Sequence, residues 1–229
     1  MRGVLRRAAD GLFPGGTNEH GLLPALLVLL TFVTGVVDAV SYLGLNHVFV
    51  ANMTGNVVFL GFALVGGANL SAWASLLALG TFMAGAWSVG RLARRVPRAG
   101  RLFVLVTAAH TVLVVAALPV ALPVALSVGH RSTAAQAVLI ALLGCGMGLQ
   151  NAVVRRLAVP DLTTTVLTLT VTGLAADAPG AATVRRVVSF AAMFTGALCG
   201  AALYLGAGTV AALVPVLVLL TAVTAAARS

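Results

Sequence analysis

The sequence predicts an all-α protein, a polytopic transmembrane helical bundle with six full spans and two shorter polar segments that are re-entrant or broken. Hydrophobic residues make up 60% of the 229 residues and charged residues only 8%, with a mean hydropathy of +1.09. A soluble domain carries roughly 25% charged residues. This composition therefore excludes a soluble enzyme, and the hydropathy and arginine patterns below predict the span number.

Eight apolar runs follow a basic, polar N-terminal segment. We interpret six runs as full crossings because about 20 apolar residues are needed to span a bilayer. Residues 1–20 are expected to form a cytoplasmic tail. Residues 21–229 are expected to form a single transmembrane domain with halves at about 21–126 and 134–229. The runs are 22–45, 48–67, 70–90, 102–126, 134–154, 162–176, 187–207 and 209–227.

The arginine distribution predicts which runs do not cross. All 14 basic residues are arginines. If every run crosses, the arginines divide equally between the two sides. If runs 48–67 and 162–176 return to the side they came from, all arginines except Arg131 share one side. Basic residues favour the cytoplasmic side, so the second arrangement is preferred, with a cytoplasmic N-terminus.

The two halves also predict an internal two-fold repeat. Asp38-Ala39-Val40 and Asn151-Ala152-Val153 lie 113 positions apart, and Gly85 and Gly196 lie 111 apart. Each half has a long run, a polar run, a run with small residues and a run with proline. With two re-entrant runs the repeats are inverted, as in many secondary transporters; if all eight runs cross, they are parallel.

Two motifs carry a family resemblance. DAVSYLGLNHVFVANMTGNVVFLG and GLQNAVVRRLAVPDLTTTVLTLTVTGLAADA resemble the YoaK-like family of uncharacterised bacterial membrane proteins (domain of unknown function 1275), over nearly the whole chain from Leu22 onward. The resemblance implies a bacterial inner-membrane protein of about six spans. It implies no activity and no catalytic residues. The second motif departs from the family pattern, because VLTLTVTG lacks the expected glycine after VLT.

Asp38 is the only acidic residue within a predicted full span. A charge at membrane depth is costly and is a functional-site hypothesis. Two interpretations of Asp38 stay open, a proton-exchanging group and a structural lock between helices. His110 is either a pathway group or a packing residue, and a lone histidine in an apolar run is more often a packing residue. The predicted substrate or proton pathway comprises Asp38, Ser41, Tyr42, Asn52, Thr54, Asn56, His110, Gln150, Asn151, Thr163, Thr164 and Thr165.

These residues favour a small secondary transporter or exporter of an unidentified small molecule, proton-linked through Asp38. A membrane-embedded enzyme acting on a lipid-like or isoprenoid substrate is the alternative, with Asp38 or His110 as acid or base. A non-transporting scaffold is the third reading. We expect no cofactor, no metal and no nucleic-acid partner. The expected partners are the lipid bilayer and the small molecule, and a homodimer is a further alternative.

Overall fold

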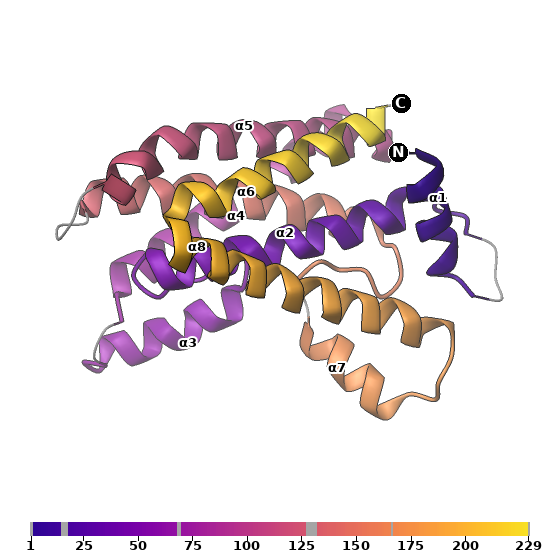
Figure 1. Ribbon diagram of the computed structural model, residues 1–229, viewed down its shortest axis with the longest axis horizontal. Helices are drawn as coiled ribbons and strands as arrows, with labels where there is room; N and C mark the ends of the chain where they lie inside the picture. The colour runs from indigo at the N-terminus through magenta and orange to yellow at the C-terminus, as the bar shows by residue number, and fades with distance from the viewer. Residues whose placement is uncertain (1, 15–17, 68–69, 127–131, 166, 229) are drawn as a thin grey trace.

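The computed structural model describes residues 2–14, 18–67, 70–126, 132–165 and 167–228. Within these ranges the chain forms helices and no β-strand, as the all-α prediction requires. The long helices run along the long axis of one bundle (Figure 1). The helices of the described part are α1 (Arg2–Gly11), α2 (Leu23–Gly44), α3 (Met53–Leu64), α4 (Ala72–Arg95), α5 (Ala99–Leu126), α6 (Thr133–Leu157), α7 (Leu167–Ala176) and α8 (Ala181–Arg228).

Five helices in the described ranges, α2, α4, α5, α6 and α8, are long and apolar enough to cross a membrane. The last of them, α8, has 48 residues, more than twice the roughly 20 needed for one crossing. Its backbone is non-helical at Gly208, with φ 82° and ψ −176°, a region open essentially only to glycine. Figure 1 shows α8 bent sharply back on itself, so predicted runs 187–207 and 209–227 are its two arms.

Both chain termini lie at one end of the bundle, together with the last turns of α4 and α6 and the first turn of α8 (Figure 1). The last turns of α4 and α6 carry the arginine pairs 94–95 and 155–156. We call this the arginine end and the opposite one the far end. Arg131, the arginine predicted to lie on the other side, is outside the described residues.

The two predicted polar runs form short helices instead of spans. Helix α3 has 12 residues and α7 has 10, and at 1.5 Å per residue neither covers a hydrocarbon core of about 30 Å. Each follows a non-helical stretch that turns back from the end of a long helix. Figure 1 shows α3 starting near the middle of the bundle and ending at the far end, whereas α7 starts near the middle and ends at the arginine end.

Small residues set the closest helix contacts. A Cβ added at Gly148 of α6 would meet the backbone of Phe82 in α4, and one added at Gly85 of α4 would meet the Cys145 carbonyl oxygen. The same relation joins α2 and α8, where a Cβ at Gly196 would meet the backbone of Phe32. Small residues allow such close approach in lipid. Thus α4 packs on α6, and the first arm of α8 packs on α2.

Gly148→Ala is expected to lower the thermal stability of the protein in detergent. The new methyl carbon would lie 2.9 Å from the Phe82 carbonyl carbon and 3.0 Å from its Cα, so the backbones of α4 and α6 must separate. Overpacking of this kind costs about 1–3 kcal/mol. Gly80→Ala is the control because nothing lies within 4 Å of a Cβ there. Equal melting temperatures for the two variants would contradict the predicted contact.

Candidate functional site

The non-helical stretch 45–52, which follows α2, is held by Asp38. The Asp38 Oδ1 atom accepts hydrogen bonds from the backbone N–H groups of Val50 at 3.1 Å and Ala51 at 2.8 Å. All three residues are buried. Backbone groups outside a helix have no water to bond at membrane depth and need a protein partner. The carboxylate therefore acts as a tether that makes an irregular backbone tolerable inside the bundle.

Asn56 satisfies the backbone at the other side of the same turn. Its Oδ1 accepts from the Phe49 N–H at 2.9 Å, and its Nδ2 donates to the Phe49 carbonyl at 2.5 Å. Asn52 begins α3 as an N-cap, accepting from the Gly55 N–H at 3.3 Å. The two amides thus hold residues 49–56 in one compact turn. Asn52 and Asn56, which were predicted to line a pathway, therefore also stabilise the local backbone.

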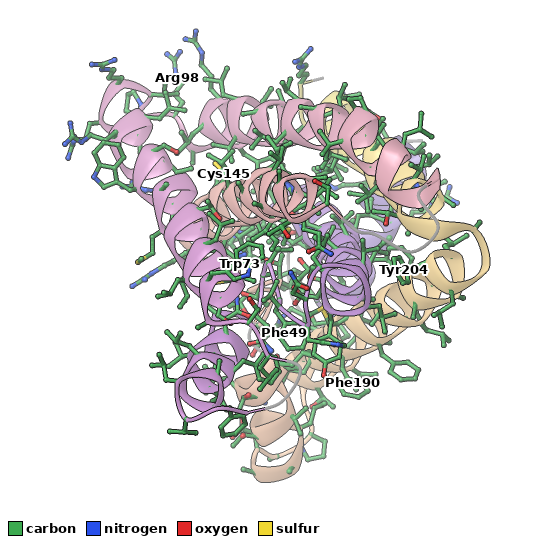
Figure 2. The ribbon with its side chains drawn as sticks, turned by 90° about the vertical axis from the view of Figure 1, so that its left-hand side faces the viewer. Phe49, Trp73, Arg98, Cys145, Phe190 and Tyr204 are labelled. Atoms are coloured by element: carbon green, nitrogen blue, oxygen red, sulfur yellow. The ribbon has the colours of Figure 1, made fainter. Side chains whose placement is uncertain are left out.

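Aromatic rings cover this turn toward the far end. Tyr42 packs on Phe49 at 5.1 Å and on His47 at 5.2 Å between ring centroids, and Phe59 of α3 stacks on Phe49 at 5.7 Å. Figure 2, which looks onto the far end, shows Phe49 between α2 and α3. The fully buried Ser41 donates to the Asp38 carbonyl of its own helix at 3.1 Å. Tyr42 and Ser41 therefore have packing partners within their own half.

The second non-helical stretch, 158–165, is held by Asn151 of α6. The Thr165 hydroxyl donates to the Asn151 Oδ1 at 2.6 Å, and the Asn151 Nδ2 donates to the Met147 carbonyl at 2.9 Å. Thr164 has a φ of 60°, a left-handed conformation that β-branched residues rarely adopt. Its buried hydroxyl has no hydrogen-bond partner in the described part of the chain. Thr163 is exposed nearby.

An ion-pair cluster anchors the same stretch at the arginine end. The Asp161 carboxylate binds Arg185 at 2.8 Å and Arg186 at 3.0 Å. Arg186 also binds Asp177 at 2.6 Å and the Gly173 carbonyl at 2.9 Å. Arg185 donates to the Leu12 carbonyl at 3.4 Å. The cluster joins the stretch, α7, α8 and the segment after α1, and none of its four charged residues is among those predicted for the pathway.

The two short helices begin at one cavity. A space of about 540 Å³, which we call the middle cavity, is lined by Asn52, Met53 and Thr54 at the start of α3 and by Thr165, Leu167 and Thr168 at the start of α7. Both figures show α3 and α7 on the same side of the bundle. A helix N-terminus carries a partial positive charge and free N–H groups. The middle cavity therefore receives two such ends.

A second space of about 820 Å³ lies toward the arginine end, and we call it the arginine-end cavity. It is lined by Asn151, Thr163, Thr165 and the arginine pair 155–156, with Gly90 near the end of α4. Phe82 and Thr165 line both this and the middle cavity. These two side chains therefore stand at the boundary between the two cavities.

A smaller polar space of about 420 Å³ lies at the far end. It is lined by Asn46, His47, Ser71, Trp73, Thr133 and Gln136. The Asn46 Nδ2 donates to the Gln136 Oε1 at 2.8 Å. This bond ties the end of α2 to the start of α6 and closes the two helices against each other.

Gln150 and His110 lie outside both the middle cavity and the arginine-end cavity. Gln150 donates from Nε2 to the Thr34 hydroxyl at 3.0 Å and to the Leu30 carbonyl at 3.3 Å, so it bridges α6 to α2. His110 is buried in α5 against Gly146 of α6, where an added Cβ would lie 2.5 Å from the ring carbon Cδ2. Neither residue lines the middle or the arginine-end cavity.

The structure brings five of the twelve predicted pathway residues to the two cavities, and the other seven, Asp38 among them, line neither. Asn52, Thr54 and Thr165 line the middle cavity, and Asn151 and Thr163 line the arginine-end cavity. Sequence reasoning missed Phe82, which has no distinguishing sequence signal. It also missed the pair 155–156, which it read only as a marker of topology. Their position just before Pro160, which interrupts the helix, was the sequence signal that could have placed them at the site.

Among the described residues, no group of three or more His, Cys, Asp or Glu side chains could hold a metal ion. Cys145 is half-buried and Cys199 is exposed, and both are free thiols. The site described above is built from amides, hydroxyls, one tethered carboxylate and arginines.

Comparison with known proteins places these features in a family. A family model described as "Protein of unknown function (DUF1275)" matches residues 26–226. The "UPF0700 transmembrane protein YoaK" of Bacillus subtilis (strain 168) is 33% identical over 159 residues, covering 68% of this chain and 67% of that protein. No solved structure matches. Because the family model covers most of the chain, the protein belongs to the DUF1275 family of membrane proteins.

Proposed function

We propose that the protein is a small secondary transporter that moves a small solute across the membrane through the region between α3 and α7. One observation carries the proposal: the N-terminal ends of these two short helices, which lead to opposite ends of the molecule, line the same middle cavity. Broken helices whose N-termini meet near the bilayer midplane are the usual construction of a transporter's binding site. Irregular backbone at this depth is tolerated where it lines a cavity.

The proposed architecture has six crossings, formed by α2, α4, α5, α6 and the two arms of α8, with two re-entrant segments. Matched contacts support an inverted repeat. Gly35 and Gly148 lie 113 positions apart, and their added Cβ atoms would meet Met193 and Phe82, which lie 111 positions apart. Asp38 and Asn151, also 113 positions apart, each accept a hydrogen bond from the stretch that precedes a short helix.

The proposed location is the bacterial cytoplasmic (inner) membrane, with the arginine end and both termini in the cytoplasm. The arginine pairs 94–95 and 155–156 close helices at this end, and basic residues near span ends favour the cytoplasmic side. The arginine-end cavity would then face the cytoplasm. The Asn46–Gln136 hydrogen bond and the Tyr42 aromatic cluster narrow the far end, whose polar space of about 420 Å³ is about half the 820 Å³ of the arginine-end cavity. We therefore assign this conformation to an inward-facing state.

Asp38 is the proposed point of proton linkage. It lies within α2 and binds the backbone immediately before the middle cavity. A change in its charge would alter two hydrogen bonds that position the start of α3. This gives a physical route by which a proton and the shape of the cavity could be coupled.

The contacts favour transport over the two alternatives. An enzyme would need its acid and histidine to converge, but Asp38 bonds Val50 and Ala51 whereas His110 packs on Gly146. A scaffold would need its polar groups to be filled by protein partners. Asp38 and Ser41 on α2 are filled in this way, since both are buried and bonded within the protein. The two non-helical segments, in contrast, line open space. These observations support a solute pathway.

The first test is cysteine accessibility in a Cys145→Ala, Cys199→Ala background, with a membrane-impermeant methanethiosulfonate reagent. Thr163→Cys is expected to react from the cytoplasmic side, and Ser75→Cys, at a buried position in α4, is the unreactive control. Phe82→Ala is expected to speed the reaction of Thr54→Cys from the cytoplasmic side, because Phe82 stands between the two cavities. An unreactive Thr163→Cys, or no effect of Phe82→Ala, contradicts the pathway.

The second part of the test is flux through proteoliposomes, measured by stopped-flow light scattering. The solutes are acetate, phosphate, glycine, glycerol and choline, which span both charge signs and neutrality. Protein is expected to accelerate at least one of them over empty liposomes, and Phe82→Ala is expected to raise that rate. Accessible cavities with no accelerated flux for any solute across this panel would reject transport of such small solutes.

A further inference from the structure

We infer that the arginine-end cavity binds an oxyanion, a carboxylate or phosphate carried by a small solute. This rests on the proposed function, because it names the chemical class of the transported molecule. Arg155 and Arg156 both line the cavity, together with the Asn151 amide and the Thr163 and Thr165 hydroxyls. An arginine guanidinium offers a fork of N–H donors that matches the two oxygens of a carboxylate or phosphate.

No carboxylate in the described part of the chain pairs with these two arginines. No Asp or Glu among the described residues lies within 4.0 Å of either guanidinium, although four ion pairs form elsewhere in that part of the chain. Asp161 belongs to the neighbouring stretch, but its two oxygens are occupied by Arg185 and Arg186. The cluster of Asp161, Asp177, Arg185 and Arg186 is therefore neutral as a whole, and the pair 155–156 leaves the cavity positive.

The inner part of the cavity has the same polarity. Thr165 lines both cavities, and α7 begins two residues later at Leu167. The partial positive charge of a helix N-terminus extends over its first turn. No acidic side chain lines either cavity among the residues described. An anion moving inward from the arginines would thus meet hydroxyl donors and two helix N-termini, whereas a cation would meet no carboxylate among these lining residues.

The volume limits the size of the solute. About 820 Å³ lies within the range of small-molecule sites, and the middle cavity beyond Phe82 is smaller, about 540 Å³. A small carboxylate or phosphate ester fits both. A phospholipid headgroup carries the same oxyanion chemistry, so the experiment separates the two sources.

The test is thermal unfolding of the purified full chain in an uncharged detergent, with ionic strength held constant by sodium chloride. The probes are sodium phosphate, sodium citrate, choline chloride and short-chain phosphatidylglycerol. A ligand that binds only the folded state raises the unfolding midpoint. Phosphate or citrate is expected to raise it, and choline is not. Arg155→Gln with Arg156→Gln is expected to weaken the apparent affinity by about tenfold or more, the scale of a lost charge-assisted hydrogen bond.

Arg94→Gln with Arg95→Gln is the matched control. It removes the same charge from another arginine pair at the same end of the bundle. This pair lies in the last turn of α4 and does not line the arginine-end cavity. Affinity is expected to be unchanged in this control. Arg155→Lys with Arg156→Lys is expected to recover part of the affinity, because the charge stays and the fork is lost. Each variant's unfolding midpoint without added anion reports whether it folds.

Three results would overturn the inference: equal losses in both arginine pairs, stabilisation by phosphatidylglycerol alone, or no stabilisation by either soluble oxyanion. The first indicates general surface charge and the second a lipid headgroup site. This binding assay involves no transport. Anion binding without flux would reject the transporter proposal alone, whereas flux of a neutral solute without anion binding would reject the anion site alone.

Discussion

Asp38→Ala is expected to lower the free energy of unfolding by about 2–6 kcal/mol, because two buried backbone donors lose their partner and each such loss costs about 1–3 kcal/mol. The donors are the N–H groups of Val50 and Ala51, at 3.1 and 2.8 Å from the carboxylate. Without the carboxylate, the stretch before α3 has no replacement acceptor at that depth. The same substitution is expected to abolish flux, because the start of α3 forms one wall of the middle cavity.

Ser41→Ala is the matched control for stability. Ser41 lies one turn further along α2 and is fully buried, but its hydroxyl bonds only the Asp38 carbonyl of its own helix. Bonds of this kind contribute little to helix stability, so the variant is expected to change the unfolding midpoint only slightly. Equal destabilisation by Ser41→Ala and Asp38→Ala would show that the hydrogen bonds of Asp38 contribute no stability beyond side-chain packing.

Asp38→Asn separates the tether from the proton. An asparagine side-chain oxygen can accept the same two N–H bonds, so most of the stability is expected to return. The variant carries no titratable group, and its flux is therefore expected to continue without dependence on a proton gradient. The measurement is solute flux with and without an imposed pH difference. Unaltered proton dependence in a folded Asp38→Asn protein would reject Asp38 as the coupling group.

Asp161→Ala is expected to destabilise the protein by about 1–3 kcal/mol, because the buried Arg185 guanidinium loses its carboxylate partner. The Asp161, Arg185 and Arg186 side chains are only 18%, 10% and 16% exposed. The substitution leaves two guanidinium groups short of a carboxylate where water reaches poorly. It also releases the stretch 158–165 from α8, so the walls of the arginine-end cavity are expected to loosen.

Asp10→Ala is the control for Asp161→Ala. Asp10 pairs with Arg6 at 3.4 Å, but these side chains are 51% and 57% exposed. Exposed pairs contribute about 0–1 kcal/mol and are screened by salt. Unfolding midpoints in low and high salt are therefore expected to show a large, salt-resistant loss for Asp161→Ala and a small loss for Asp10→Ala. Similar small losses in both variants would mean that the Asp161 cluster is effectively solvated.

Local properties were accessible from the sequence. Hydropathy is a property of each run, and it predicted both the membrane class and the positions of the long helices. The interruptions near Asn52 and before Thr163 were predicted from polar residues and Pro160, and α3 and α7 begin just after them. The arginine clusters predicted which helix ends lie together, because basic residues near span ends favour one side of the membrane regardless of how the helices pack.

The hydrogen-bond partners of the polar side chains could not be predicted from the sequence. The sequence left Asp38 open between proton exchange and a structural lock between helices, and the structure shows its carboxylate bonded to the backbone N–H groups of residues 50–51. Gln150, predicted beside Asn151 in one site, bridges to Thr34. Phe82 lines the boundary of both cavities only because α4 packs on α6 through Gly148. These relations join residues far apart in the chain.

The sequence by itself determined three properties: that the chain is a membrane protein, at which positions its helices are interrupted, and which helix ends carry the arginines. Each of these follows from the solvation of short segments. Only the tertiary structure decided that the starts of α3 and α7 share one cavity and that the pair 155–156 lines the next. The physical reason is that helix packing in lipid depends on the fit of small residues between distant segments, which no single segment encodes.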